Sequence, residues 1–126
     1  MRVLVVDDEP AVRSAVQRAL ALERYDVAVA ADGREALDCV ASEALDAVVL
    51  DIAMPHVDGI EATARIRAEL PEVRILGLSM QPRSAVSDAI TNAGAERLFV
   101  KGVDTQRLVD YLLLIYASRS GNRATT

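Results

Sequence analysis

Aromatic residues and cysteines are scarce in this chain. It has no tryptophan, one phenylalanine and three tyrosines among 126 residues, so valine, leucine, isoleucine and alanine must build its core. The single cysteine, Cys39, excludes an intramolecular disulfide and is consistent with a reducing compartment. A chain of this length should form one domain and bury about two thirds of the surface that its unfolded form exposes.

Long apolar runs and a positive net charge are also missing. The longest apolar run near the end, Tyr111 to Tyr116, is far shorter than the roughly 20 residues that a membrane span needs. Met1 and Arg2 lead directly into a strand-like run, so we expect no signal peptide. The net charge of −5 argues against nucleic-acid binding by the domain itself. We therefore expect a soluble cytoplasmic domain that binds neither nucleic acid nor a membrane.

Short apolar runs alternate with amphipathic segments along the chain. The apolar runs predict strands over 3–6, 27–30, 47–50, 73–78 and 98–100. The amphipathic segments predict helices over 11–22, 35–42, 60–70, 84–93 and 105–117. This alternation predicts an α/β fold: a flavodoxin-like, doubly wound, five-stranded parallel sheet of order 2-1-3-4-5 with helices on both faces. Residues 1–117 would form the domain, and 118–126 a flexible tail or linker.

Acidic, hydroxyl and basic residues follow four of the predicted strands, at the points where the strands end. Asp7 and Asp8 follow the first strand, Asp51 the third, Ser79 the fourth and Lys101 the fifth. Ligands of such sheets bind outside the carboxyl ends of the strands, so three carboxylates should converge there. Crowded like charges are unfavourable unless a cation neutralises them, and Mg²⁺ (or Mn²⁺) prefers oxygen ligands.

Each of these residues also has an ordinary structural interpretation. Asp7 or Asp8 could cap the first helix, and Asp51 could be a loop acid after a strand. Ser79 and Lys101 could be polar residues at strand ends. Their joint occurrence at four strand ends makes chance a poor explanation.

The chemistry that such a cluster supports is phosphoryl transfer to a carboxylate. A carboxylate can attack phosphorus and form an acyl phosphate, and catalysis is then mostly positioning and charge neutralisation. Asp51 has the central position of the phosphoacceptor, while Asp7 and Asp8 would hold the metal. No residue is well suited to activate water, which predicts a long-lived phosphoaspartate. Met80 could shield the acyl phosphate from water, or it could simply fill space.

At this point the motifs resemble those of response-regulator receiver domains in two-component signalling, over residues 1 to about 117. The resemblance rests on Val5 to Pro10, Leu50 to Pro55, Asp58-Gly59, Leu78-Ser79, Gly94-Ala95 and Lys101. It implies that a histidine kinase or a phosphotransfer domain phosphorylates Asp51. It also implies that Mg²⁺ binds to Asp8, Asp51 and the backbone carbonyl of Ala53, with Asp7 acting partly through water. The phosphoryl oxygens would contact Ser79 and Lys101.

Two positions depart from the family pattern. The family usually has proline after its lysine, where this chain has Gly102, so we expect a looser loop around Lys101. The family also usually has Tyr or Phe three residues before the lysine, where this chain has Leu98, and Phe99 lies on the opposite face of the strand. We therefore expect Ser79 and the loop before the fourth helix to carry the output instead of an aromatic relay.

The last predicted helix offers a candidate interaction surface. Its expected core stripe consists of Leu108, Val109, Leu112, Leu113 and Tyr116. Tyr111 and Leu114 fall outside this stripe, which makes them either scattered surface residues or part of an interface. An effector domain or a second copy of the chain would bind to the surface of 84–93, 98–100 and 105–117.

Two other functions compete with a phosphoacceptor module. Phosphatases of the haloacid-dehalogenase type have a second Asp two residues after their nucleophile, where this chain has Ala53. A degenerate receiver would act only by binding partners, and the intact Asp7, Asp8, Asp51 and Lys101 argue against it. We therefore expect no enzyme, but a phosphoacceptor that assists its own phosphorylation and dephosphorylation.

Overall fold

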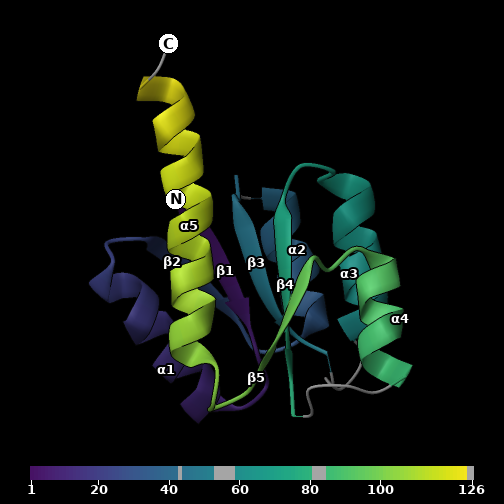
Figure 1. Ribbon diagram of the computed structural model, residues 1–126. Helices are drawn as coiled ribbons and strands as arrows, with labels where there is room; N and C mark the ends of the chain where they lie inside the picture. Colours follow the sequence, from purple (N-terminus) through teal and green to yellow (C-terminus); the bar gives the residue numbers. More distant parts are fainter. Residues whose placement is uncertain (43, 53–58, 81–84, 125–126) are drawn as a thin grey trace.

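The computed structural model describes residues 1–42, 44–52, 59–80 and 85–124, in which strands and helices alternate strictly (Figure 1). The strands are β1 (Arg2–Val6), β2 (Asp26–Ala30), β3 (Ala47–Asp51), β4 (Arg74–Ser79) and β5 (Arg97–Val100). The helices are α1 (Pro10–Leu22), α2 (Gly33–Ser42), α3 (Gly59–Glu69), α4 (Ala85–Ala93) and α5 (Thr105–Ala124). All ten predicted elements are therefore present.

The strands form one parallel sheet of order β2-β1-β3-β4-β5, which confirms the predicted fold. The register aligns the carboxyl ends of the central strands. Val6 of β1 pairs with Leu50 of β3, and Asp51 pairs with Leu78 of β4. The residues that follow these strands are therefore neighbours at one edge of the sheet.

Two hydrophobic layers hold the sheet between its helices. Helices α1 and α5 cover one face, and α2, α3 and α4 cover the other (Figure 1). Alternate residues of β1 supply the two layers, Val3 and Val5 to the first and Leu4 and Val6 to the second. All four are fully buried, which explains why the strand is a continuous apolar run in the sequence.

Helix α5 is longer than the apolar pattern predicted. It continues past 117 to Ala124, and its last turns project beyond the sheet (Figure 1). The prediction ended where core-facing residues ended, but the hydrogen bonds of a helix are local and can continue beyond the last residue that faces the core. Within the part of the chain that is described, none of the helices combines the length and the apolar character of a membrane span.

The buried face of α5 also needs one correction. Leu108 and Leu112 are buried as predicted, but Ile115 completes this face, whereas Tyr116 is 43% exposed. Ile115 lies two helical turns after Leu108, on the same side of the helix, and Tyr116 is rotated by a further 100°. There its ring packs edge-on against Tyr25, with centroids 5.9 Å apart. The remaining predicted members, Val109 and Leu113, are buried and half-buried respectively.

Candidate functional site

Three carboxylates meet at the carboxyl edge of the sheet. Asp51 is the last residue of β3, and Asp7 and Asp8 directly follow β1. One carboxylate oxygen from each of the three residues lies within 4.8 Å of the others. Asp7 and Asp51 are almost completely buried, at 0% and 1% exposure, whereas Asp8 is exposed. The convergence that strand order predicted is therefore present in the structure.

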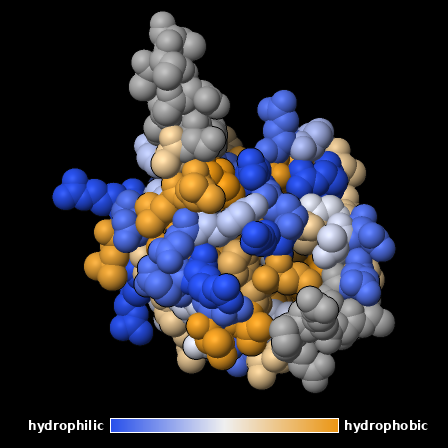
Figure 2. Space-filling model, viewed as in Figure 1, coloured by the Kyte–Doolittle hydropathy of each residue, from blue (hydrophilic) through white to orange (hydrophobic). Residues whose placement is uncertain are grey.

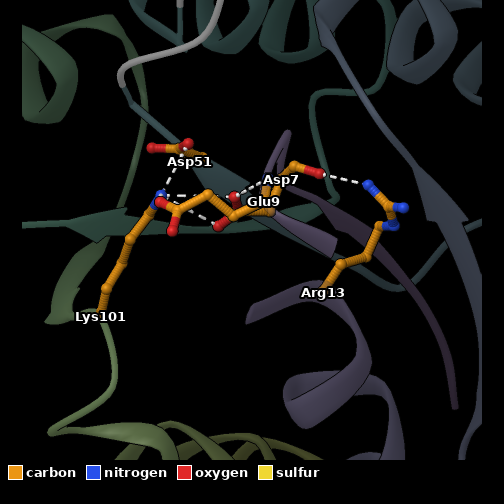
Figure 3. A network of polar contacts seen from close by, with 5 residues as sticks. All are labelled: Asp7, Glu9, Arg13, Asp51 and Lys101. Atoms are coloured by element: carbon orange, nitrogen blue, oxygen red, sulfur yellow. Dashed lines mark hydrogen bonds and ion pairs between the residues drawn. The ribbon is translucent and has the colours of Figure 1, made fainter. Parts of the chain in front are cut away.

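The ammonium group of Lys101, which follows β5 at the same edge of the sheet, faces Asp7 and Asp51 (Figure 3). Lys101 Nζ lies 2.8 Å from Asp51 Oδ2, 2.9 Å from Glu9 Oε1 and 3.2 Å from Asp7 Oδ2. Burial of the ammonium lowers the pKa of Lys101, but hydrogen bonds to Asp51 and Glu9 and attraction by the other charges outweigh it, so the pKa is raised. Lys101 is therefore a permanent cation at physiological pH.

Glu9 is a member of this site that sequence reasoning missed. It lies just before α1, and its side chain is 55% exposed, yet it reaches across to the Lys101 ammonium. The signal for it in the sequence is a third consecutive acid after the first strand. Glu9 therefore adds a negative charge at the solvent-facing side of the site.

Asp7 is held by several hydrogen bonds and is not the N-cap residue of α1, which is Glu9. Its Oδ1 accepts hydrogen bonds from the Glu9 backbone N–H at 2.9 Å and from Lys101, and its carbonyl accepts one from Arg13. Its Oδ2 is buried and accepts no hydrogen bond, although Lys101 Nζ lies 3.2 Å away. Burial is the largest influence on this carboxyl and raises its pKa. An oxygen in this situation fits a hard divalent cation, so the residues present suit Mg²⁺ or Mn²⁺.

The other predicted members of the site lie beside this cluster or outside the described residues. Ser79 ends β4, is 5% exposed and is one residue beyond Leu78, the partner of Asp51 in the sheet. Ser79 therefore belongs to the same edge as the carboxylates. The predicted carbonyl ligand of Ala53 falls in 53–58, outside the described residues, and stays a prediction.

The turn that carries Lys101 is well bonded, contrary to the looser loop that we expected. The Lys101 N–H donates to the Ser79 carbonyl at 2.9 Å, and the Asp104 N–H donates to the Val100 carbonyl at 2.9 Å. Gly102 has φ +75°, in the left-handed region that glycine adopts without strain. Glycine at this position therefore permits a tight turn. Throughout the described ranges every peptide bond is trans.

Leu98 and Phe99 lie on opposite faces of β5, as predicted. Leu98 is half-buried over Gly77 of β4. A Cβ added to Gly77 would lie 2.4 Å from Leu98 Cδ2 and 3.4 Å from Ile52 Cγ2. Gly77 thus leaves the space that Leu98 fills beside the end of β3. Phe99 is buried on the other face and packs against Tyr111, with ring centroids 5.9 Å apart.

The candidate output residues outside β5 differ in their surroundings. Tyr111 is only half-exposed: its hydroxyl donates to Glu96, and the Arg97 guanidinium lies 5.1 Å from its ring centroid. The expectation that Tyr111 is an exposed apolar residue was therefore wrong, whereas its place in an interface stays a prediction. Leu114 is 67% exposed, as predicted. Met80 is 71% exposed, which does not support a shield over Asp51.

Comparison with known proteins agrees with this fold. The family model of the response regulator receiver domain matches residues 3–113. The response regulator MprA of Mycolicibacterium vanbaalenii is 41% identical over 111 residues, which cover 86% of this chain and 47% of that protein. The chain therefore spans about half the length of the curated relatives that it matches. It belongs to the family of response regulator receiver domains.

Solved structures give the same result. The response regulator TrrA of Thermotoga maritima, in complex with Mg²⁺-BeF, is 34% identical with a TM-score of 0.79, covering 88% of this chain and 95% of that one. A LuxR-family response regulator from Aurantimonas sp. SI85-9A1 is 36% identical with a TM-score of 0.79, covering 93% and 85%. The chemotaxis protein CheY4 of Vibrio cholerae is 30% identical with a TM-score of 0.82, covering 89% and 95%.

Proposed function

We propose that this domain accepts a phosphoryl group on Asp51 from a histidine kinase or a phosphotransfer domain and acts as a Mg²⁺-dependent switch. The observation that carries the proposal is the setting of Asp51. Its carboxylate is 1% exposed, lies 2.8 Å from the Lys101 ammonium and shares the site with two further carboxylates. An oxygen held in this way is positioned to attack and faces a cation that can stabilise the product.

The transfer step needs one nucleophile and charge neutralisation. A carboxylate oxygen of Asp51 forms a bond to phosphorus while the bond from phosphorus to the donor atom breaks, and that electron pair leaves with the donor. The Lys101 ammonium contacts a phosphoryl oxygen, and the Ser79 hydroxyl donates a hydrogen bond to another. Ala53 stands where aspartyl phosphatases have a second acid, so we propose a phosphoacceptor that assists its own phosphorylation and dephosphorylation.

The metal ligands in this proposal are side chains and one carbonyl at the carboxyl edge. Asp8, Asp51 and the Ala53 carbonyl would hold Mg²⁺ (or Mn²⁺), with Asp7 contributing partly through water. When bound, the ion supplies positive charge that neutralises the phosphoryl oxygens. The buried Asp7 Oδ2, which accepts no hydrogen bond, supports this assignment.

Asp7→Asn tests the metal site through stability. Wild type is expected to gain about 1–3 kcal/mol in free energy of unfolding at Mg²⁺ concentrations well above Kd, and the variant to lose most of this gain. In a chelator, the variant should be at least as stable as wild type, because burial raises the pKa of Asp7 and so makes its charge unfavourable in the fold. Urea titrations with and without Mg²⁺ measure both values. Asp26→Asn, at an exposed carboxylate, should keep the wild-type response, and an equal response in Asp7→Asn would refute the assignment.

The proposed function itself is tested by incubation with acetyl phosphate and Mg²⁺. Intact-mass spectrometry should show one phosphoryl adduct on the wild-type chain, and peptide mapping should place it on Asp51. A chelator should prevent its formation. Absence of an adduct, or continuous release of inorganic phosphate without one, would contradict the proposal, the second outcome favouring a phosphohydrolase.

The proposed output surface consists of α4, β5 and α5. A groove of about 380 Å³ between β5 and α5 is lined by Arg97, Leu98, Phe99, Asp104, Arg107, Asp110, Tyr111 and Leu114. Figure 2 shows apolar and charged surface side by side on this side of the molecule. We propose that an effector domain or a second copy binds here in the cytoplasm and that residues 118–126 act as a linker. The greater length of the curated relatives supports an attached domain.

Leu114→Lys tests this surface. The residue is 67% exposed, so the free energy of unfolding should change by less than about 0.5 kcal/mol. Self-association of the wild type in Mg²⁺ and beryllofluoride should weaken about tenfold or more in the variant, because a charge is placed in an apolar contact. Sedimentation velocity measures it. Leu22→Lys, at an 83% exposed leucine of α1, is the matched control; identical association of both variants and wild type would dismiss the surface as a dimer contact.

A further inference from the structure

The reach of Lys101 depends on a backbone turn that has no proline to stiffen it. Strand β5 ends at Val100, and Lys101 is the first residue beyond it. From there its side chain must extend to Asp51 and place the ammonium at 2.8 Å. Gly102 follows with φ +75°, and a Cβ there would meet nothing within 4 Å. The glycine therefore permits this conformation but holds it by no side-chain contact.

A carboxylate from the end of the turn supplies the missing constraint. The Val100 N–H donates to Asp104 Oδ2 at 2.8 Å. The Val100 carbonyl in turn accepts from the Asp104 N–H at 2.9 Å and from the Val103 N–H at 3.3 Å. Asp104 thus binds both backbone polar groups of the residue that precedes Lys101. These bonds close the turn around the three residues between them, Lys101, Gly102 and Val103.

The direction of this carboxylate separates it from ordinary helix capping. Asp104 directly precedes α5, and its carbonyl accepts the Leu108 N–H at 2.9 Å. A side chain at such a position usually accepts from the N–H groups of the helix that follows. Here Oδ2 accepts from strand β5 instead, and the carboxylate is 15% exposed. A second partner, Arg107, lies 3.7 Å away with its side chain 80% exposed and so contributes little.

We propose that Asp104 is a positioning residue for phosphoryl transfer, which fixes the turn over 100–104 and thereby holds the Lys101 ammonium against the phosphoryl site. The proposal rests on the function proposed above. The Asp104 carboxylate acts through the backbone and touches neither metal nor phosphoryl group. Loss of its hydrogen bond would free the Val100 N–H and let the lysine side chain occupy more than one position.

Asp104→Ala and Asp104→Asn test the proposal in the full chain. The alanine variant should bind beryllofluoride, in saturating Mg²⁺, about tenfold more weakly than wild type and take up phosphoryl groups more slowly to a similar extent. Its Mg²⁺ affinity should stay within about twofold, because the metal ligands lie on other strands. Asparagine should restore most of the loss, because its carbonyl oxygen accepts the same hydrogen bond. Calorimetric titrations measure both affinities.

The lysine itself gives a direct spectroscopic reading. Lys101 is the only lysine of the chain, so ¹⁵N-lysine labelling yields a single ammonium signal. This signal should be sharp in wild type and in the asparagine variant, and broadened or shifted in the alanine variant. Arg65→Ala, which breaks an exposed ion pair with Glu61 on α3, is the control and should behave as wild type. If Asp104→Ala does not fold, Gly102→Ala can replace it, because alanine strains the same turn at the positive φ. It should likewise bind beryllofluoride more weakly while its Mg²⁺ affinity stays nearly unchanged.

The outcomes separate the two proposals. If wild type binds no beryllofluoride and forms no adduct, the proposed function fails. If wild type does both but Asp104→Ala is unchanged, only the positioning role fails. Equal losses of Mg²⁺ and beryllofluoride affinity, or no rescue by asparagine, would show that Asp104 merely stabilises the fold.

Discussion

Asp51→Asn is expected to abolish the phosphoryl adduct completely. Asparagine has nearly the same size and shape, and its carbonyl oxygen can still accept the hydrogen bond that Lys101 donates to Asp51 at 2.8 Å. It is neutral, so it loses the anionic oxygen that attacks phosphorus. Intact-mass spectrometry after incubation with acetyl phosphate and Mg²⁺ gives the measurement, with the wild type in parallel.

Two controls show that the loss of the adduct is due to the missing carboxylate: the variant must be folded, and no other residue must accept the phosphoryl group. In a chelator, Asp51→Asn should be at least as stable as wild type, because Lys101 keeps Asp7 and Glu9 as partners and one buried charge is removed. Its far-UV circular dichroism should be unchanged. An adduct that persists at the wild-type rate would place the acceptor elsewhere, and Asp7 and Asp8 would be the first candidates.

The sequence predicted the fold and the acid cluster because both depend on strong, repeated signals. Runs such as Val3 to Val6 have the composition of strands that are buried on both faces, and strict alternation with helices leaves few topologies. Once the strand order is known, the residues after β1 and β3 must be neighbours. The convergence of Asp7, Asp8 and Asp51 therefore follows from topology and needs no knowledge of side-chain conformation.

The contacts that the sequence did not predict depend on side-chain conformation or on loop geometry. Glu9 is an exposed acid at the start of a helix, and nothing in the spacing shows that it turns towards Lys101. Asp104 has the position of an ordinary helix-start residue, and only the structure shows its carboxylate accepting from the Val100 N–H. Tyr111 looked exposed on a helical wheel, which cannot show the packing of Phe99 against it.

These contacts indicate how phosphorylation could act on the rest of the domain. Lys101 is shared by Asp7, Glu9 and Asp51, and a phosphoryl group on Asp51 would compete for it with strong acceptor oxygens. The Glu9 contact is the most exposed of the three and therefore the easiest to give up. To convert a conformation populated at 1% into one populated at 99%, the phosphoryl group must interact more favourably with that conformation than with the other by about 5.5 kcal/mol. Ion pairs that rearrange inside a buried site can supply a large part of it.

Among the proposed substitutions, Lys101→Met is expected to destabilise the fold most. In a chelator, the free energy of unfolding should fall by about 3–5 kcal/mol, because Asp7 and Asp51 remain buried without their cation. Chemical denaturation measures the change. Arg74→Met, which breaks the more exposed ion pair with Glu96, should cost less than about 1 kcal/mol and serves as the control.

The dependence of this loss on pH and on Mg²⁺ identifies its electrostatic origin. The raised pKa of Lys101 keeps its contribution fully present below the ordinary lysine value and removes it only in strong alkali, so it is constant between about pH 5 and 8. Without Lys101, the raised pKa of Asp7 makes the folded state bind more protons than the unfolded state, so the variant should regain stability as the pH falls.

Added Mg²⁺ should also restore part of the loss, since a cation can replace the ammonium among the carboxylates. Lys101→Arg keeps the positive charge but places it in a planar group. This variant should therefore recover most of the stability but less of the phosphorylation rate. A deficit that neither acid nor Mg²⁺ reduces would mean that Lys101 stabilises the fold by packing, and that the carboxylates do not need a cation.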